Sequence, residues 1–239
     1  MRLIRIEGLN AGYGKFQVLF DISTNIDSKK MTVIVGPNGS GKSTILKSIF
    51  GLTNIYSGGI FLNGEQITRM SPHQIARRGI AYVPQVGNIF SNLTVRENLM
   101  MSGYTLKREE VRAKIPEVLE YYPVLKECYN RRPSTMSGGE RQMLAMSMAL
   151  MRKPHVMLFD EPSASLSPKI SAQVLDEIKK LRDDMGITVV LVEQNAIDSL
   201  KCGDRAVLLV SGRVAFDGPA QELLGSPELG SMYLGIKAA

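Results

Sequence analysis

The sequence predicts an α/β fold whose core is a mainly parallel sheet. Apolar runs of strand length occur at residues 31–35, 156–159 and 187–192. Segments with apolar residues at helical spacing follow the first two runs, and such alternation favours parallel strands joined by helices. With 239 residues, of which 44% are hydrophobic and 22% charged, the chain can bury the core of one domain with a subdomain.

Strands are expected ahead of this core and directly after its first helix. Short strands at residues 3–7 and 22–26 show alternating apolar and polar positions. A further pair of strands is expected around Ile60 and Ile80. The sequence therefore predicts additional β structure in the N-terminal third of the chain.

A glycine-rich segment joins the first core strand to the first core helix. Residues 36–43 read GPNGSGKS and match the P-loop pattern G-x-x-x-x-G-K-[ST] at every fixed position. Backbone N–H groups of such a loop surround phosphate oxygens, the lysine reaches the β and γ phosphates, and the serine hydroxyl coordinates Mg²⁺. A purely structural glycine turn is the alternative. The predicted nucleotide-binding residues are Gly36, Pro37, Asn38, Gly39, Ser40, Gly41, Lys42, Ser43 and Thr44, with Lys42 also catalytic and Ser43 also a metal ligand.

A helical stretch is expected in the middle of the chain. Helices are predicted at residues 95–101 and 109–122, with a break or kink of the second at Pro116 because proline cannot donate an interior helical hydrogen bond. Another helix is expected to begin at Ser137 and to be buried on several sides, because apolar residues lie on more than one of its faces.

The start of that last helix has an unusual composition. Ser137 and Glu140 have the spacing of a capping box, and Gly138 and Gly139 form the first turn. Glycine inside a helix costs about 1 kcal/mol relative to alanine. Two glycines there indicate close approach of an anion to bare backbone N–H groups. A structural helix with incidental glycines is the alternative that this motif alone leaves open.

Two carboxylates follow the apolar run at residues 156–159. Asp160 and Glu161 stand at the carboxyl end of a buried strand, the edge where open α/β sheets bind ligands. Asp160 is predicted to hold Mg²⁺, and Glu161 is predicted to orient or deprotonate the attacking water. A solvated acidic turn is the alternative.

The rest of the chain continues the α/β pattern and ends in a hairpin. A helix begins with Pro168 in its first turn, and its apolar face is formed by Ile170, Val174, Ile178 and Leu181. Strands at residues 206–210 and 213–216 are separated by a Ser-Gly turn.

These elements in this order resemble the ATP-binding cassette (ABC) family of transporter ATPases over essentially the whole chain. The resemblance implies that Ser137, Gly138, Gly139 and Glu140 grip the γ-phosphate of ATP held by another ATPase chain. It implies that Gln85 senses Mg²⁺, as a metal ligand and a catalytic residue, and signals to the membrane partner. It also implies that Tyr13 stacks on adenine. The implied cofactors are ATP and Mg²⁺.

The same resemblance implies the full architecture. A P-loop NTPase core with a mainly parallel sheet carries an N-terminal antiparallel β subdomain, within residues 1–85 and 154–239. A helical subdomain with the Ser137 motif is inserted at residues 86–153. The whole chain is expected to form a single ABC ATPase domain.

Two positions depart from the family pattern. Gln194 stands where the family usually has a histidine that contacts the γ-phosphate, and it is taken as the catalytic residue at that position. Its amide can donate a hydrogen bond but cannot become cationic or shuttle a proton. Ser167 stands where aspartate is common.

Three segments narrow the resemblance to the second ATPase subunit of branched-chain amino acid importers: residues 136–140, 191–196 and 233–235. Related urea and amide importers share much of this pattern. The implied partners are a second ABC ATPase chain in a homodimer or heterodimer, transmembrane permease subunits and, indirectly, an external solute-binding protein.

Composition is consistent with a peripheral protein at the cytoplasmic face of the membrane. The apolar runs fall short of the roughly 18 residues that a membrane helix needs, and residues 1–7 contain no signal-peptide apolar region. The net charge is +6, but basic and acidic residues are interspersed, so no nucleic acid partner is expected. Cys128 and Cys202 are far apart in sequence, and neither a disulfide nor a metal site is expected.

Other ATPase classes fit less well. A DNA-repair or chromosome ATPase of the same superfamily would need a long heptad-bearing insertion before the Ser137 motif. A P-loop kinase of small metabolites would have no use for that motif. A non-transport ATPase of the cassette family usually carries two cassettes in one chain, whereas this sequence has one.

Overall fold

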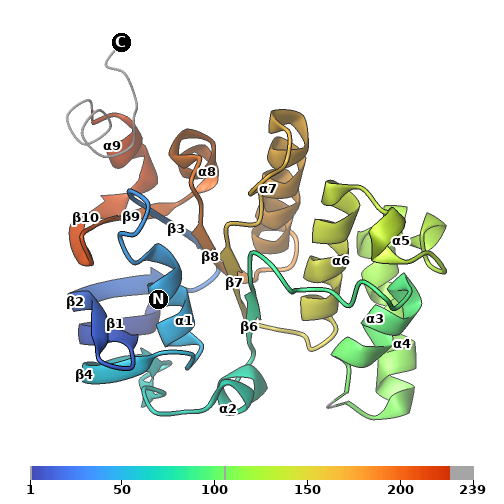
Figure 1. Cartoon of the computed structure of the whole chain (residues 1–239), viewed down its shortest axis with the longest axis horizontal. Coiled ribbons are helices and arrows are strands. Elements are labelled where there is room, and N and C mark those ends of the chain that lie inside the picture. Colours follow the sequence, from blue (N-terminus) through green and yellow to red (C-terminus); the bar gives the residue numbers. More distant parts are fainter. Residues whose placement is uncertain (1, 105, 227–239) are drawn as a thin grey trace.

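Two sheets and the helices packed on them make up the computed structural model, which describes residues 2–104 and 106–226 (Figure 1). The larger sheet has six strands in the order β10-β9-β3-β8-β7-β6. All neighbouring strands in it are parallel except β9 and β10, which form the predicted hairpin. Its strands are β3 (Met31–Val35), β6 (Ile80–Val83), β7 (Val156–Asp160), β8 (Thr188–Val192), β9 (Arg205–Val210) and β10 (Arg213–Pro219).

The smaller sheet is antiparallel and has the order β2-β1-β4-β5. Its strands are β1 (Arg2–Tyr13), β2 (Phe16–Asp27), β4 (Asn54–Leu62) and β5 (Glu65–Gln66). β1 and β2 have 12 residues each, longer than expected, because register shifts let their pairing continue past irregular positions. The two sheets together confirm the predicted α/β fold with an antiparallel N-terminal part.

Both strands expected around Ile60 and Ile80 are present, but they belong to different sheets. Ile60 lies in β4, which pairs with β1, whereas Ile80 begins β6, which pairs with β7 in the other sheet. The helix α2 (Pro72–Arg77) stands between β4 and β6 in the chain and separates the two strands. The positions of both strands were predicted from the sequence, but their partners come from distant parts of the chain.

The helices in the middle of the chain lie on the right of Figure 1, beside the larger sheet. They are α3 (Val95–Ser102), α4 (Arg108–Tyr121), α5 (Val124–Glu127), a 3-10 turn (Pro133–Thr135) and α6 (Gly138–Leu150). The remaining helices are α1 (Lys42–Ile49), α7 (Pro168–Asp183), α8 (Ala196–Cys202) and α9 (Ala220–Leu224). In the described residues, none of the helices is both long enough and apolar enough to span a bilayer.

Of the break or kink expected at Pro116, the break is wrong, because α4 runs continuously through this residue. Proline removes the hydrogen bond to the carbonyl four residues earlier, which here belongs to Arg112. Both Arg112 and Pro116 are exposed, so water can satisfy that carbonyl. The helix thus tolerates proline on its solvent face.

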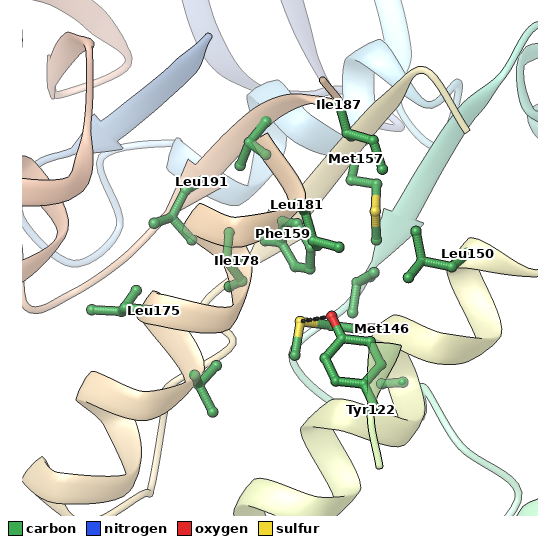
Figure 2. Close-up of a cluster of buried hydrophobic side chains, with 14 of the residues drawn as sticks. Tyr122, Met146, Leu150, Met157, Phe159, Leu175, Ile178, Leu181, Ile187 and Leu191 are labelled. Atoms are coloured by element: carbon green, nitrogen blue, oxygen red, sulfur yellow. Dashed lines mark hydrogen bonds between the residues drawn. The ribbon is translucent and has the colours of Figure 1, made fainter. Parts of the chain in front are cut away.

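Both faces of the larger sheet are buried, and each belongs to a different apolar cluster. On β7, Met157 and Phe159 pack on one side, and Val156 and Leu158 on the other. The helices α6 and α7 cover the first side, where Ile178 and Leu181 approach Phe159 (Figure 2). This explains why the core strands read as continuous apolar runs.

Candidate active site

The P-loop connects β3 to α1 and passes against β9. At Gly36 (φ 149°), an added Cβ would lie 2.1 Å from the carbonyl oxygen of Leu209, so only glycine fits. The Lys42 ammonium donates hydrogen bonds to the carbonyl oxygens of Gly36 (2.9 Å) and Pro37 (3.1 Å). Burial lowers the pKa of Lys42, while the negative charges of Glu161 and Asp160 act in the opposite direction.

The P-loop meets the carboxylate that ends β7. Ser43 Oγ donates a hydrogen bond of 2.6 Å to Oδ1 of Asp160, which is 117 residues away in sequence. The hydroxyl of Tyr82 on β6 donates to the other oxygen, Oδ2, at 2.8 Å. Burial raises the pKa of Tyr82, and the charge of Asp160 raises it further. Sequence reasoning brought Ser43 and Asp160 into one site but missed Tyr82, whose only signal was a hydroxyl in an apolar strand.

These residues fit a magnesium nucleotide. A hydroxyl and a carboxylate are the oxygen donors that Mg²⁺ prefers, and it usually takes few protein ligands beside phosphates. The described residues contain no group of three or more His, Cys, Asp or Glu side chains that could hold a metal by themselves. In the P-loop, Ser40 Oγ is buried and makes no hydrogen bond to a described residue. A phosphate oxygen is the kind of acceptor to which this hydroxyl would donate.

Glu161 lies next to Asp160 and is held by two amides. Its Oε2 accepts hydrogen bonds from Nε2 of Gln194 (2.8 Å) and from Nε2 of Gln85 (3.2 Å). Its backbone is left-handed, with φ at 50°, a conformation that costs a non-glycine residue about 1–2 kcal/mol. Such strain is concentrated at functional sites. The structure thus brings three sequence-predicted residues together around one oxygen atom.

Glu193 at the end of β8 is a second residue that sequence reasoning missed. Its carboxylate is only 2% exposed and accepts hydrogen bonds from the backbone N–H of Ser163 (3.0 Å) and of Gln194 (3.2 Å). Burial raises the pKa of this carboxyl. The signal was an acid directly after four apolar residues. Glu193 therefore connects Ser163, in the loop that follows Glu161, with Gln194, whose amide hydrogen-bonds to Glu161.

The Ser137 motif forms the predicted capping box at the start of α6. Ser137 Oγ accepts from the N–H of Glu140 (3.2 Å), and Glu140 Oε2 accepts from the N–H of Ser137 (2.6 Å). The hydrogen bond from the Ser137 N–H to this carboxylate is the main cause that lowers the pKa of Glu140. A side chain of the same chain, Leu166, packs closely against Gly138. An added Cβ on Gly138 would lie 2.4 Å from Cδ2 of Leu166.

The Ser137 motif stays apart from the P-loop of its own chain. Within residues 2–104 and 106–226, no hydrogen bond joins residues 137–140 to residues 36–44. In Figure 1, α7 and β7 lie between α6 and α1. One chain therefore presents two separate parts of the predicted site.

The remaining predicted residues lie at the edges of this region. Tyr13 ends β1 and is 42% exposed. Ser167 is the residue before α7 and makes no side-chain capping bond. Thr44 is buried in the first turn of α1.

A groove runs beside the segment that contains Gln85. It has a volume of about 280 Å³ and lies between β6, α2 and the middle helices. Residues on its walls include Phe50, Tyr82, Pro84, Asn88, Tyr104 and Met148.

Sequence comparisons place the chain among transporter ATPases. A family profile described as ABC transporter matches residues 19–164. The probable branched-chain amino acid transport ATP-binding protein LivF of Archaeoglobus fulgidus is 51% identical over 98% of this chain and 99% of its own length. The high-affinity branched-chain amino acid transport ATP-binding protein BraG of Pseudomonas aeruginosa is 41% identical over 98% of this chain and 100% of its own length. Residues 233–235, which carried part of the sequence resemblance, lie outside the described residues.

Solved structures agree with this placement. A nucleotide-free ATP-binding cassette from an ABC transporter has a TM-score of 0.87 at 25% identity and covers 100% of both chains. The dimeric post-hydrolysis state of the ATP-binding cassette MJ0796, bound to ADP and phosphate, has a TM-score of 0.78 at 25% identity and covers 91% of this chain and 99% of that chain. The chain therefore belongs to the ABC transporter family, and its fold is that of the family's ATPase subunit.

Proposed function

We propose that this chain binds ATP with Mg²⁺ and hydrolyses it to drive solute import. The observation that carries the proposal is the meeting of distant motifs in one cluster. Ser43 of the P-loop contacts Asp160, and the neighbouring Glu161 receives hydrogen bonds from Gln85 and Gln194. A structural loop or a solvated acidic turn would not require these contacts.

The roles follow from the chemistry of each group. The P-loop N–H groups and Lys42 bind the β and γ phosphates, and Lys42 offsets the negative charge that develops on the γ-phosphoryl group. Ser43, Asp160 and Gln85 hold Mg²⁺, which when bound neutralises phosphate charge. Glu161 orients the attacking water and accepts its proton, and the amides of Gln85 and Gln194 hold its Oε2 in place. Tyr13 stacks on adenine.

The active unit is a dimer with nucleotide between the two chains. Residues 137–140 make no hydrogen bond to their own P-loop, and they form the N-terminus of α6, the kind of helix end at which backbone N–H groups bind phosphate. We therefore assign them to the γ-phosphate of ATP on a second ATPase chain, which is either a copy or a similar chain. A dimer with ADP and phosphate is the state solved for the MJ0796 relative.

The solute we assign is a branched-chain amino acid. Two relatives of nearly equal length carry this solute class in their names. The permease subunits contact the solute, and an external binding protein delivers it to them. A short helix of the permease would enter the groove beside Gln85 and hold the chain at the cytoplasmic face of the membrane.

In the same proposal, two parts of the chain form separate subdomains with different roles. Residues 1–85 and 154–239 form the nucleotide-binding core with its β subdomain, and residues 86–153 form the helical subdomain that carries the Ser137 motif. The whole chain acts as a single ABC ATPase domain.

The direct test replaces Glu161 by Gln. We expect ATP hydrolysis to fall by about 100-fold or more, because the variant cannot accept a proton from water, while ATP binding persists. Light scattering should then detect a dimer with ATP and Mg²⁺, in the presence of the permease if needed. Glu120→Gln on the exposed face of α4 serves as the matched control and should hydrolyse at the parent rate.

Two results would contradict this proposal. Parent-rate hydrolysis by Glu161→Gln would remove Glu161 from the base role, and a monomer at saturating ATP and Mg²⁺ with the permease supplied would exclude the shared site. The solute is tested separately by co-purifying the permease and measuring uptake of leucine, isoleucine and valine against urea in reconstituted vesicles. Uptake of urea alone would reassign the solute.

A further inference from the structure

The hydroxyl of Tyr82 has one hydrogen-bond partner among the described residues, and that partner is Asp160. We propose that Tyr82 is a positioning residue that holds Asp160 in the orientation required for Mg²⁺. The inference rests on the proposed ATPase function and adds a residue to it. It concerns the hydroxyl alone, because the ring has a separate packing role.

The two oxygens of Asp160 are divided between two hydroxyls. Ser43 donates to Oδ1 at 2.6 Å and Tyr82 donates to Oδ2 at 2.8 Å. Asp160 is 4% exposed, so water has little access to replace either donor. With Oδ2 engaged by the phenol, the carboxylate plane is fixed, and Oδ1 stays on the side of the P-loop serine. A partner that orients a ligating carboxylate in this way tunes metal affinity.

Two kinds of contact fix the position of Tyr82: the pairing of its strand with β7, and the packing of its ring on Phe50. Tyr82 pairs with Leu158 in the parallel register of β6 and β7, so its backbone lies beside the strand that ends in Asp160. Its ring packs on that of Phe50 with centroids 5.5 Å apart and planes inclined by 34°. Phe50 directly follows α1, the helix that begins with Lys42 and Ser43. The P-loop helix and the phenol are therefore held in one packed unit.

The same ring also forms part of the wall of the groove beside Gln85. Tyr82 thus touches the groove with its ring and the metal-binding carboxylate with its hydroxyl. Phenylalanine would fill the same volume and keep the contact with Phe50. The hydroxyl adds the bond to Asp160 and nothing else among the described contacts.

The test is Tyr82→Phe, which removes one oxygen atom. Mn²⁺ serves as the metal probe, and electron paramagnetic resonance counts free Mn²⁺ in the presence of the full chain and ADP. We expect Mn²⁺ affinity of the ADP complex to fall by about tenfold. Binding of ADP in EDTA should change by less than about twofold, because the P-loop is intact. In ATPase assays, the Mg²⁺ concentration for half-maximal rate should rise, and excess Mg²⁺ should restore kcat.

The control is Tyr121→Phe, which also removes a phenol bonded to a carboxylate. Tyr121 donates to Asp184 at 3.2 Å, and Asp184 precedes β8 at the opposite end of the strands from Asp160. This variant should leave Mn²⁺ affinity unchanged. Equal loss in both variants, or a loss of kcat in Tyr82→Phe that excess Mg²⁺ does not restore, would show a general structural effect and overturn the inference.

The outcome also separates this inference from the proposed function. Unchanged Mn²⁺ affinity in Tyr82→Phe, with parent protein that binds ADP and Mn²⁺, would overturn the role of Tyr82 alone. Parent protein that binds neither ADP nor Mn²⁺ would overturn the proposed function itself. Thermal unfolding of both variants without nucleotide shows whether the fold is retained.

Discussion

The side-chain amide of Gln194 lies 2.8 Å from Oε2 of Glu161 and donates a hydrogen bond to it. Gln85, which precedes Glu161 by 76 residues in the sequence, donates to the same oxygen at 3.2 Å. Among the described residues, no hydrogen bond to Oε1 of Glu161 is found. The two amides therefore fix one oxygen of the carboxylate and leave the other available for a water molecule. A neutral amide performs this orienting task without bringing a positive charge.

Replacing Gln194 by Ala is expected to lower kcat by about tenfold, with a smaller change in KM for ATP. The reason is the loss of a hydrogen bond to a charged group, worth about 1.5–3 kcal/mol, while Gln85 still holds Glu161. Because both amides share one acceptor, adding Gln85→Ala should give an effect that differs from the sum of the single effects. Steady-state ATPase assays measure both quantities. Gln74→Ala, which removes an amide that caps α2, is the control, and an unchanged rate in Gln194→Ala would exclude the orienting role.

Replacing Glu193 by Gln is expected to change how stability depends on pH. The folded pKa of Glu193 lies above its usual value of 4.5, because burial disfavours the charged form. Its contribution is therefore fully present below pH 4.5 and is lost as pH rises through the raised folded pKa. The free energy of unfolding of Glu193→Gln, relative to the parent, should rise with pH across this window and then level off. Urea denaturation at a series of pH values measures this difference.

Replacing Glu140 by Gln is expected to change the pH dependence of stability in the opposite direction. Hydrogen bonds from Ser137 hold the folded pKa of Glu140 below 4.5, so its contribution is present above that pH and is lost as pH falls through the lowered value. Glu140→Gln should therefore lose its stability deficit relative to the parent in acid. The same slope in both variants would show that the assigned environments are wrong.

Replacing Gly138 by Ala should destabilise the chain although alanine favours helices. A Cβ there would lie 2.4 Å from Cδ2 of Leu166, so the end of this half-buried side chain must move, at a cost near the lower end of the roughly 1–3 kcal/mol that overpacking takes. Gly139→Ala should cost less, because its nearest contact, Cγ2 of Ile170, is 3.0 Å away. Thermal unfolding of the chain without nucleotide measures both.

The cause of the Gly138 effect is tested by a double variant. Leu166→Ala removes the obstructing methyl groups, so Gly138→Ala should cost little in that background. A cost that persists there would place the strain elsewhere. ATP-dependent dimer formation in the double variant then shows whether the glycine is also required by the partner chain.

Much of the site could be predicted from the sequence, because each of its motifs has a fixed local geometry. The P-loop needs only a strand, eight residues and a helix, and the capping box needs only four residues, so both were found at their positions. Asp160 and Glu161 were placed at a strand end by the apolar run before them. The positions of Gln85 and Gln194 came from resemblance to a family, since an isolated glutamine has no local signature.

The sequence by itself determined the α/β class, the P-loop, the capped helix and the acidic strand end, because short-range periodicity and turn chemistry specify them. Only the tertiary structure decided that β4 and β6 belong to different sheets, and that Tyr82 and Glu193 complete the site. These outcomes depend on which strands pair and which side chains are buried together. Such contacts join residues far apart in the chain, and no local pattern encodes a partner that distant.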